Sequence, residues 1–205
     1  MLPYDVRRTN DAIDRLLAVT TNPRHRFLLQ AFHRHRFLEI AGRYEEIFAP
    51  EMMAPEPVYH FFYAKMTARV VGNDVKNLYA HWGQTNQTIF YAVTEQIAVA
   101  DNYVASVATL YQQRLGAELA QAGFEIDDPN AYYLYYAEGA QQIWPYDDQC
   151  RLLGEDVWEP KAQLAKVIKL APHDVVTTAQ AAELLAPHIK PLPKFDPAAM
   201  GPGPR

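Results

Sequence analysis

The stretch over residues 94–160 constrains the fold more than any other part of the chain. An alternating apolar run stops at Asp101-Asn102 and resumes at Tyr103, which predicts two strands joined by a two-residue turn. A tyrosine-rich run, a short strand at Ile143-Trp144 and a last strand over residues 150–158 follow. The segment therefore predicts a meander of long antiparallel strands with aromatic inner faces.

Helical patterns precede this meander. Apolar residues recur at three- and four-residue spacing in the second half of a helix expected from about residue 24 to 48. A strand is expected over residues 58–63, and a further helix after Gly72, with Tyr79 and Trp82 on one face. Together these elements predict an α+β fold in which a curved sheet wraps against helices and encloses a pocket.

Composition divides the chain into three parts. Residues 1–22 read as a short helical extension and residues 23–160 as one domain. Residues 161–205 are rich in proline, which predicts a tail that is either partly disordered or wrapped over a neighbouring subunit.

Charge and cysteine content exclude several classes of protein. The formal net charge of −5 lacks the basic surface of a nucleic-acid binder. No apolar run reaches membrane-spanning length, and the first residues do not read as a signal peptide. The single cysteine, Cys150, excludes an internal disulfide framework and fits a reducing compartment. We therefore expect a cytoplasmic protein that binds neither nucleic acid nor a membrane.

Three sequence segments resemble a known superfamily. VVGNDVKNLYAHW, IAVADNYVASV and IWPYDDQCRLLGEDVWEP are similar to the helix, hairpin and closing strand of the SnoaL-like, nuclear transport factor 2-like proteins, over roughly residues 24–160. The resemblance implies a cone-shaped, strongly curved antiparallel sheet wrapped around long N-terminal helices. The superfamily includes isomerases, dehydratases, cyclases and non-enzymatic transport factors. It also includes lyases that remove formaldehyde from lignin-derived diaryl diols, and the length, termini and aromatic richness here are most similar to those lyases.

Histidine and tyrosine residues are the candidate catalytic groups. His60 and Tyr59 are neighbours on a strand, so at most one of them points into the pocket. A neutral histidine there would serve as a general base. His33 on the long helix is the alternative base, Tyr59 or Tyr44 would assist the base, and Lys65 could stabilise an oxyanion. Each also has a structural interpretation: His60 at a sheet edge, His33 in the core, and Lys65 in solvent.

Aromatic side chains are the candidate substrate contacts. They present flat apolar surface with phenolic hydroxyl groups, which suits an aromatic ligand that carries oxygen substituents. Plain sheet packing explains a single tyrosine equally well. Arg151 either faces an oxyanion or pairs with Glu155, and we expect His25 and His35 to be exposed. The candidate substrate contacts are Phe37, Phe62, Tyr79, Trp82, Tyr103, Tyr111, Tyr136, Trp144 and Arg151.

These observations lead to one functional hypothesis and two alternatives. We expect a cofactor-independent lyase that removes formaldehyde or water from a hydrophobic, hydroxylated aromatic substrate. No metal site is expected, because His33 and His35 diverge on a helix and no third ligand is suitably spaced. The alternatives are an isomerase or dehydratase of the same fold, and a non-catalytic small-molecule binding protein. We expect a homodimer or a homotrimer.

Overall fold

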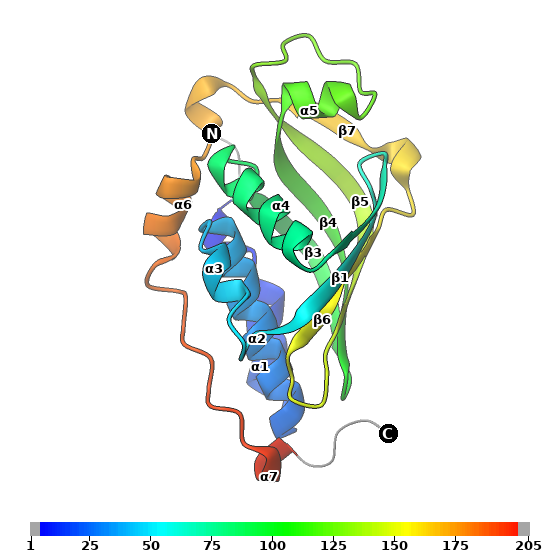
Figure 1. Ribbon diagram of the computed structural model, residues 1–205. Coiled ribbons are helices and arrows are strands. Elements are labelled where there is room, and N and C mark those ends of the chain that lie inside the picture. Colours follow the sequence, from blue (N-terminus) through cyan, green and yellow to red (C-terminus); the bar gives the residue numbers. More distant parts are fainter. Residues whose placement is uncertain (1–4, 201–205) are drawn as a thin grey trace.

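A curved sheet with helices packed on its inner face forms the body of the molecule (Figure 1). The computed structural model describes residues 5–200. Residues 1–4 of the expected N-terminal extension and 201–205 of the expected tail lie outside this range. The sheet has seven strands in the order β2-β1-β6-β5-β4-β3, with β7 paired to β5. The strands are β1 (Met53–Tyr63), β2 (Met66–Val71), β3 (Phe90–Val99), β4 (Tyr103–Leu115), β5 (Tyr132–Pro145), β6 (Leu152–Trp158) and β7 (Lys166–Lys169).

The helices lie mainly on one side of the sheet (Figure 1). This arrangement confirms the expected α+β fold with a curved sheet wrapped against N-terminal helices. Within residues 5–200, no helix is both long and apolar enough to cross a lipid bilayer. The α-helices are α1 (Asp11–Val19), α2 (Pro23–Ile40), α3 (Tyr44–Ile47), α4 (Asn73–Gln84), α5 (Gly116–Gln121), α6 (Thr178–Leu185) and α7 (Pro197–Met200), and the 3₁₀ turns are Val6–Arg8, Ala162–Leu164 and Pro172–Asp174.

The central helix, α2, is buried on almost every side. It begins with Pro23 at its first position and with the Asn22 side chain accepting hydrogen bonds from the Arg24 and His25 backbone N–H groups. It ends at Ile40, earlier than expected, because Gly42 turns the chain with a positive φ of 66°. The polar residues His35, Arg36 and Glu39 are therefore interior, and the expectation that His35 is exposed was wrong.

Arg24 ties the start of α2 to two turns of the sheet. Its guanidinium donates to the backbone carbonyls of Asp101, Asp147 and Asp148. Asp101 lies in the β3–β4 turn, where the Ala100 N–H donates to the Tyr103 carbonyl at 2.9 Å. The predicted hairpin at Asp101-Asn102 is thus present, and the carboxylate of Asp101 lies 2.8 Å from His25 Nε2.

The segment after Pro160 packs against its own chain up to Met200. β7 extends the sheet by pairing with β5, and α6 buries Ala181 and Leu185. The Thr178 hydroxyl donates to the Gly83 carbonyl at 2.9 Å, which joins α6 to α4. The described part of the expected tail is therefore part of the same folded body.

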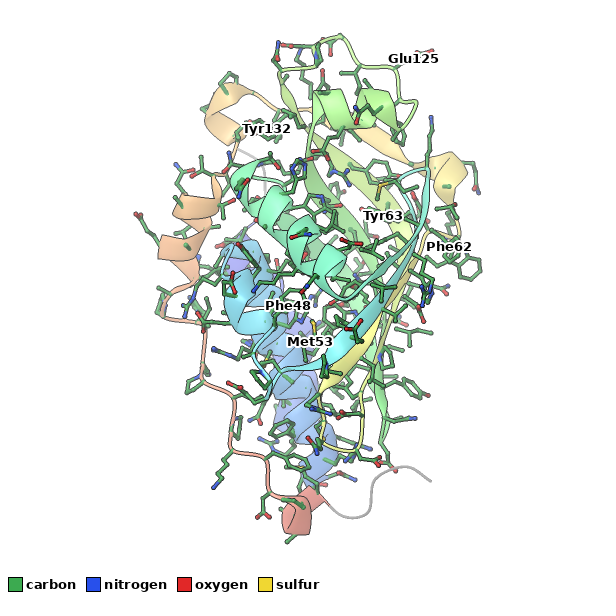
Figure 2. All side chains as sticks on the ribbon, viewed as in Figure 1. Phe48, Met53, Phe62, Tyr63, Glu125 and Tyr132 are labelled. Atoms are coloured by element: carbon green, nitrogen blue, oxygen red, sulfur yellow. The ribbon has the colours of Figure 1, made fainter. Side chains whose placement is uncertain are left out.

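The two faces of the sheet differ sharply in their surroundings. Tyr59, Phe61 and Tyr63 of β1 are buried against the helices, whereas Phe62 is 51% exposed on the outer face. Figure 2 shows Phe62 pointing away from the helical layer and Tyr63 on the inner side. Alternation along the strand therefore places Tyr59 inward and His60 outward.

An irregularity in β6 turns Glu155 toward the interior. β6 pairs with β1 in parallel, and the register shifts between the Met53–Leu152 and Val58–Gly154 pairs. Gly154 and Glu155 are both on the buried side, so strict alternation is broken. Arg151 precedes the strand and its Nε donates to Asp147 Oδ2 at 2.8 Å. The alternative of an Arg151–Glu155 ion pair was therefore wrong.

Replacing Gly154 by alanine is expected to destabilise the protein by about 3 kcal/mol or more. A Cβ at this position would lie 1.8 Å from the Val58 carbonyl oxygen, which is part of the β1 backbone and cannot move freely. Chemical denaturation measures the effect. Gly83→Ala is the matched control, because its Cβ would meet its nearest neighbour at an ordinary 3.8 Å. Equal stability of Gly154→Ala and the wild type would contradict the close approach.

Candidate functional site

A cavity lies between the inner face of the sheet and the helices α2 and α4. The centre of a water-sized sphere can reach about 60 Å³ of this cavity, so the full volume of the cavity is larger than 60 Å³. Its apolar wall consists of Phe61, Met66, Trp82, Phe90, Leu110, Trp144 and Val157. Its polar side chains are Glu39, Tyr63, Tyr79, Gln112, Arg114, Gln142 and Glu155. The cavity is therefore an aromatic enclosure that contains two carboxyl groups.

Glu39 is the cavity carboxyl with the fewest partners. Within residues 5–200, no hydrogen bond to its carboxyl group is found, and His35 Nε2 lies 4.0 Å from Glu39 Oε2. Burial raises the pKa of Glu39 to about 8, and the Arg36 guanidinium opposes that effect in part. The Glu39 carboxyl is therefore protonated for the most part at neutral pH.

Glu155 is held in place from the sheet. Gln142 Nε2 donates to Glu155 Oε1 at 3.0 Å, and the Ser106 hydroxyl donates to Gln142 Oε1 at 3.3 Å. Burial, followed by the charge of Glu39, raises the pKa of Glu155 well above its ordinary value. Because each carboxylate disfavours ionisation of a carboxyl nearby, the pair retains protons to a higher pH than two separate glutamates.

Arg36 provides the buried positive charge beside this pair. Its Nη1 donates to Glu95 Oε2 at 2.9 Å, and its guanidinium lies over the rings of Phe32 and Phe90 at 5.0 and 5.5 Å. The side chains of Arg36 and Glu95 are 1% and 2% exposed, so the ion pair is shielded from solvent. The charge on Arg36 is therefore largely neutralised by Glu95 rather than by the cavity carboxyls.

A row of neutral groups backs the cavity. His35 Nε2 lies 3.0 Å from the Tyr79 hydroxyl, which in turn donates to the Tyr59 hydroxyl at 3.4 Å. Burial lowers the pKa of His35 to about 3, so its ring is neutral. Burial also raises the pKa values of Tyr59 and Tyr79 well above 10. These groups fix the orientation of Tyr79 at the cavity wall.

The structure places the predicted catalytic residues outside the cavity lining. His60 lies on the outer face of the sheet, with Nδ1 2.7 Å from Asp156 Oδ1. His33 lies 3.5 Å from Asp14 on the far side of α2, and burial lowers its pKa to about 4. Lys65 Nζ donates to the Gly123 carbonyl at 2.6 Å. Tyr44 is the first residue of α3. Tyr59 accepts a hydrogen bond from Tyr79 but does not itself line the cavity.

Three of the predicted substrate contacts do meet at the cavity: Tyr79, Trp82 and Trp144. The others lie elsewhere. Phe37 packs in a second apolar cluster, Phe62 and Tyr103 are exposed, and Arg151 pairs with Asp147. The rings of Tyr111 and Tyr136 pack against each other at 5.1 Å, away from the cavity lining.

Sequence reasoning missed both cavity carboxyls. Glu39 lies on a helix whose amphipathic pattern is weak, so nothing in the sequence separates it from an exposed glutamate. Glu155 was placed with Arg151 by strict alternation, which the irregularity at Gly154 breaks. The Gly-Glu dipeptide after a polar turn was the available signal, because glycine inside a strand often marks a bulge.

Within the described residues, no cluster of three or more histidine, cysteine, aspartate or glutamate side chains could hold a metal ion. The Cys150 thiol is buried, and burial raises its pKa. Glu39 and Glu155 are the two carboxyl groups that line the cavity.

Comparisons with known proteins give structural neighbours only. No family model and no curated protein matches the chain. A candidate SnoaL-like polyketide cyclase from Jannaschia sp. CCS1 is 13% identical, with 68% of this chain and 89% of that chain covered and a TM-score of 0.48. The CaMKII hub of S. rosetta is 10% identical, with 68% and 98% covered and a TM-score of 0.43.

A third neighbour is a candidate dehydratase of the NTF2-like family from Streptomyces avermitilis. It is 13% identical, with 64% of this chain and 92% of that chain covered and a TM-score of 0.39. Similarities at this level assign no activity, substrate or assembly to the present chain.

Replacing Glu39 by glutamine is expected to stabilise the protein at alkaline pH. The folded state raises the pKa of Glu39 from 4.5 to about 8, so its stability contribution is full below about pH 4.5 and is lost as the pH rises through 8. Glutamine mimics the protonated form. At pH 8 to 9, Glu39→Gln should exceed the wild type by roughly 1–3 kcal/mol, with a smaller difference at pH 5.

Denaturation curves recorded from pH 5 to 9 measure this difference. Asp156→Asn is the matched control, because the Asp156 side chain is 53% exposed on the outer face. The difference in the free energy of unfolding between the wild type and Glu39→Gln should change with pH. A constant difference would show that Glu39 has the same pKa in the folded and the unfolded state, which would contradict the prediction.

Proposed function

We propose that the protein is a cofactor-independent lyase that uses Glu39 and Glu155 as its acid and base. The single observation that supports this proposal is the pair of buried carboxyl groups with raised pKa values in one aromatic cavity. Carboxyl groups with pKa values near neutral pH are efficient proton donors and acceptors under physiological conditions. Elimination needs both, since one group must remove a proton and another must protonate the leaving group.

The proposed substrate is a hydrophobic, hydroxylated diarylpropane of the lignin-derived type. The aromatic walls provide flat apolar surface for its rings. In the reaction, the carboxylate form of one glutamate takes the proton of the terminal hydroxyl group. The C–C bond to that carbon breaks, formaldehyde leaves, and the electron pair forms the new alkene. The second hydroxyl group departs as water after accepting a proton from the other glutamate.

This reaction balances without an external oxidant or reductant. A 1,3-diol that carries two aryl groups yields formaldehyde, water and a diaryl alkene. One proton moves to the first glutamate and one leaves the second, so the pair ends in the opposite protonation pattern. Two neighbouring carboxyl groups can restore the starting state by exchanging a single proton. The buried position excludes most competing water.

We assign the base role to Glu39, because within residues 5–200 no hydrogen bond occupies its carboxyl oxygens. Glu155 is fixed by Gln142, and burial raises its pKa well above the ordinary value of a glutamate, which suits the acid. Turnover should therefore rise with pH toward about 8 as the fraction of ionised Glu39 grows. His60 makes no part of this arrangement, since it lies on the opposite face of the sheet.

Glutamine substitution at either carboxyl is expected to lower turnover by about a hundredfold or more. The assay follows formaldehyde release and the absorbance of the diaryl alkene with a panel of lignin-type diaryl diols. Asp156→Asn is the matched control. Asp156 follows Glu155 in the chain, but its carboxylate lies on the outer face of the sheet. This variant should retain nearly full activity.

Several outcomes would contradict this proposal. Water loss without formaldehyde would identify a dehydratase instead. Full activity in Glu39→Gln and Glu155→Gln, together with loss in His60→Ala, would restore the histidine hypothesis. Tight binding of the whole panel without turnover would favour a non-catalytic binding protein.

The expectation of a homodimer or homotrimer stays a prediction. The outer sheet face exposes several large apolar side chains, namely Phe62, Tyr103, Val107, Ile143 and Trp158. Light scattering is expected to give a mass of two or three chains, and Trp158→Asp is expected to lower that mass by weakening the contact. A mass of one chain for the wild type at micromolar concentration would overturn the prediction.

A further inference from the structure

Two hydrogen-bond donors in the cavity wall have no acceptor. The Trp144 indole N–H and the Tyr63 hydroxyl are closed to solvent and form no hydrogen bond within the described residues. Both side chains line the cavity. Leaving a buried donor unpaired is unfavourable, so each of these groups calls for a partner such as an ordered water or a bound ligand.

Packing prevents either donor from turning toward another partner. The Trp144 ring meets the rings of Phe32 and His35 edge to face, each at a centroid distance of 4.6 Å. Tyr63 packs edge to face on Tyr135 at 5.2 Å. The acceptors nearby are already engaged: Glu159 accepts from the Tyr135 hydroxyl through both oxygens and from the Ala64 N–H.

The two donors come from different positions along the sheet. Continuing the β5–β6 register by one residue places Trp144 opposite Glu155, which pairs with Tyr59 on β1. Tyr63 lies four residues further along β1, roughly 13 Å at the backbone. Trp144 therefore lies level with Glu155 on the sheet, and Tyr63 lies further along it.

Charged groups around the cavity are already compensated. Arg36 pairs with Glu95 at 2.9 Å, and Arg114 pairs with Glu118 at 3.2 Å. Arg114 Nε also donates to Gln87 Oε1 at 3.2 Å. An anionic ligand would enter beside two carboxyl groups with no uncompensated cation to receive it, so the site favours a neutral ligand.

We infer that Trp144 and Tyr63 determine specificity by donating hydrogen bonds to acceptor oxygens at the two ends of one flat, neutral, two-ring ligand. The oxygen at Trp144 belongs to the ring nearer Glu155, and the oxygen at Tyr63 anchors the far ring. This inference deepens the proposed function and rests on it for the choice of a two-ring ligand.

Binding of three stilbenes tests this inference without any turnover. The probes are 4,4′-dihydroxystilbene, 4-hydroxystilbene and stilbene, and calorimetry or displacement of a fluorescent ligand measures their affinities. For the wild type, each hydroxyl group should improve affinity by about tenfold. Trp144→Phe or Tyr63→Phe should each reduce the affinity for the dihydroxy compound to that of the monohydroxy compound.

The monohydroxy compound provides the internal check. It can place its single oxygen at either end, so each single variant should bind it with nearly unchanged affinity. The double variant should bind all three stilbenes about equally. Trp82→Phe is the matched control, since Trp82 lines the same cavity but its indole nitrogen is not among the buried, unpartnered atoms; it should weaken all three probes alike.

The outcomes separate the inference from the proposed function. Equal affinity of the wild type for all three stilbenes, or parallel losses for all three in Trp144→Phe and Tyr63→Phe, would overturn the inference even if the protein releases formaldehyde. The predicted pattern without any lyase activity would support the inference and reject the proposed reaction. Tyr63→Phe removes one oxygen and keeps the ring, so this test survives if Trp144→Phe fails to fold.

Discussion

The burial of two carboxyl groups in one aromatic cavity is the constraint on which the rest of the site depends. Removing Glu39 and Glu155 from water disfavours their ionised forms, and the charge of Glu39 further disfavours that of Glu155. A protein gains no stability from such a pair at neutral or alkaline pH. Its retention in the interior is consistent with a site where proton exchange matters more than stability.

The surrounding structure reduces the energetic cost of this arrangement. Arg36 lies three residues before Glu39 on α2, but its charge is paired with Glu95 and placed over two aromatic rings. Both carboxyls can then keep their protons instead of collapsing into an ion pair with Arg36. Gln142 holds Glu155 in position. Within residues 5–200, no hydrogen bond reaches the Glu39 oxygens, so they are available to a ligand.

Local sequence patterns predicted the elements of the fold better than their long-range pairing. The Asp101-Asn102 turn, the long strands and the helix with Tyr79 and Trp82 follow from residue-scale periodicity. The parallel pairing of β1 with β6 and the packing of α6 on the body depend on contacts between distant segments, which periodicity does not encode. Alternation along the strand places Tyr59 and His60 on opposite faces, but it does not say which of the two faces inward; the packing of the helices decides that.

The site was harder to predict, for the same physical reason. A glutamate in a helix that is buried all round has the same local pattern as an exposed glutamate, so Glu39 carried no signal. Glu155 lies on the buried side together with Gly154, so alternation counted from Arg151 did not predict its face. Tyr79, Trp82 and Trp144 were predicted as substrate contacts because aromatic rings present flat apolar surface to an aromatic ligand.

The protonation state of the buried pair tests the central claim most directly. Nuclear magnetic resonance of the protein with ¹³C-labelled glutamate carboxyl groups, recorded from pH 4 to pH 10, reports each titration separately. We expect Glu39, assigned from Glu39→Gln, to titrate near pH 8, and Glu155 to titrate well above the ordinary range of a glutamate. Titration of every glutamate near pH 4.5 would contradict the account, because the cavity would then hold two ordinary carboxylates with no proton to exchange.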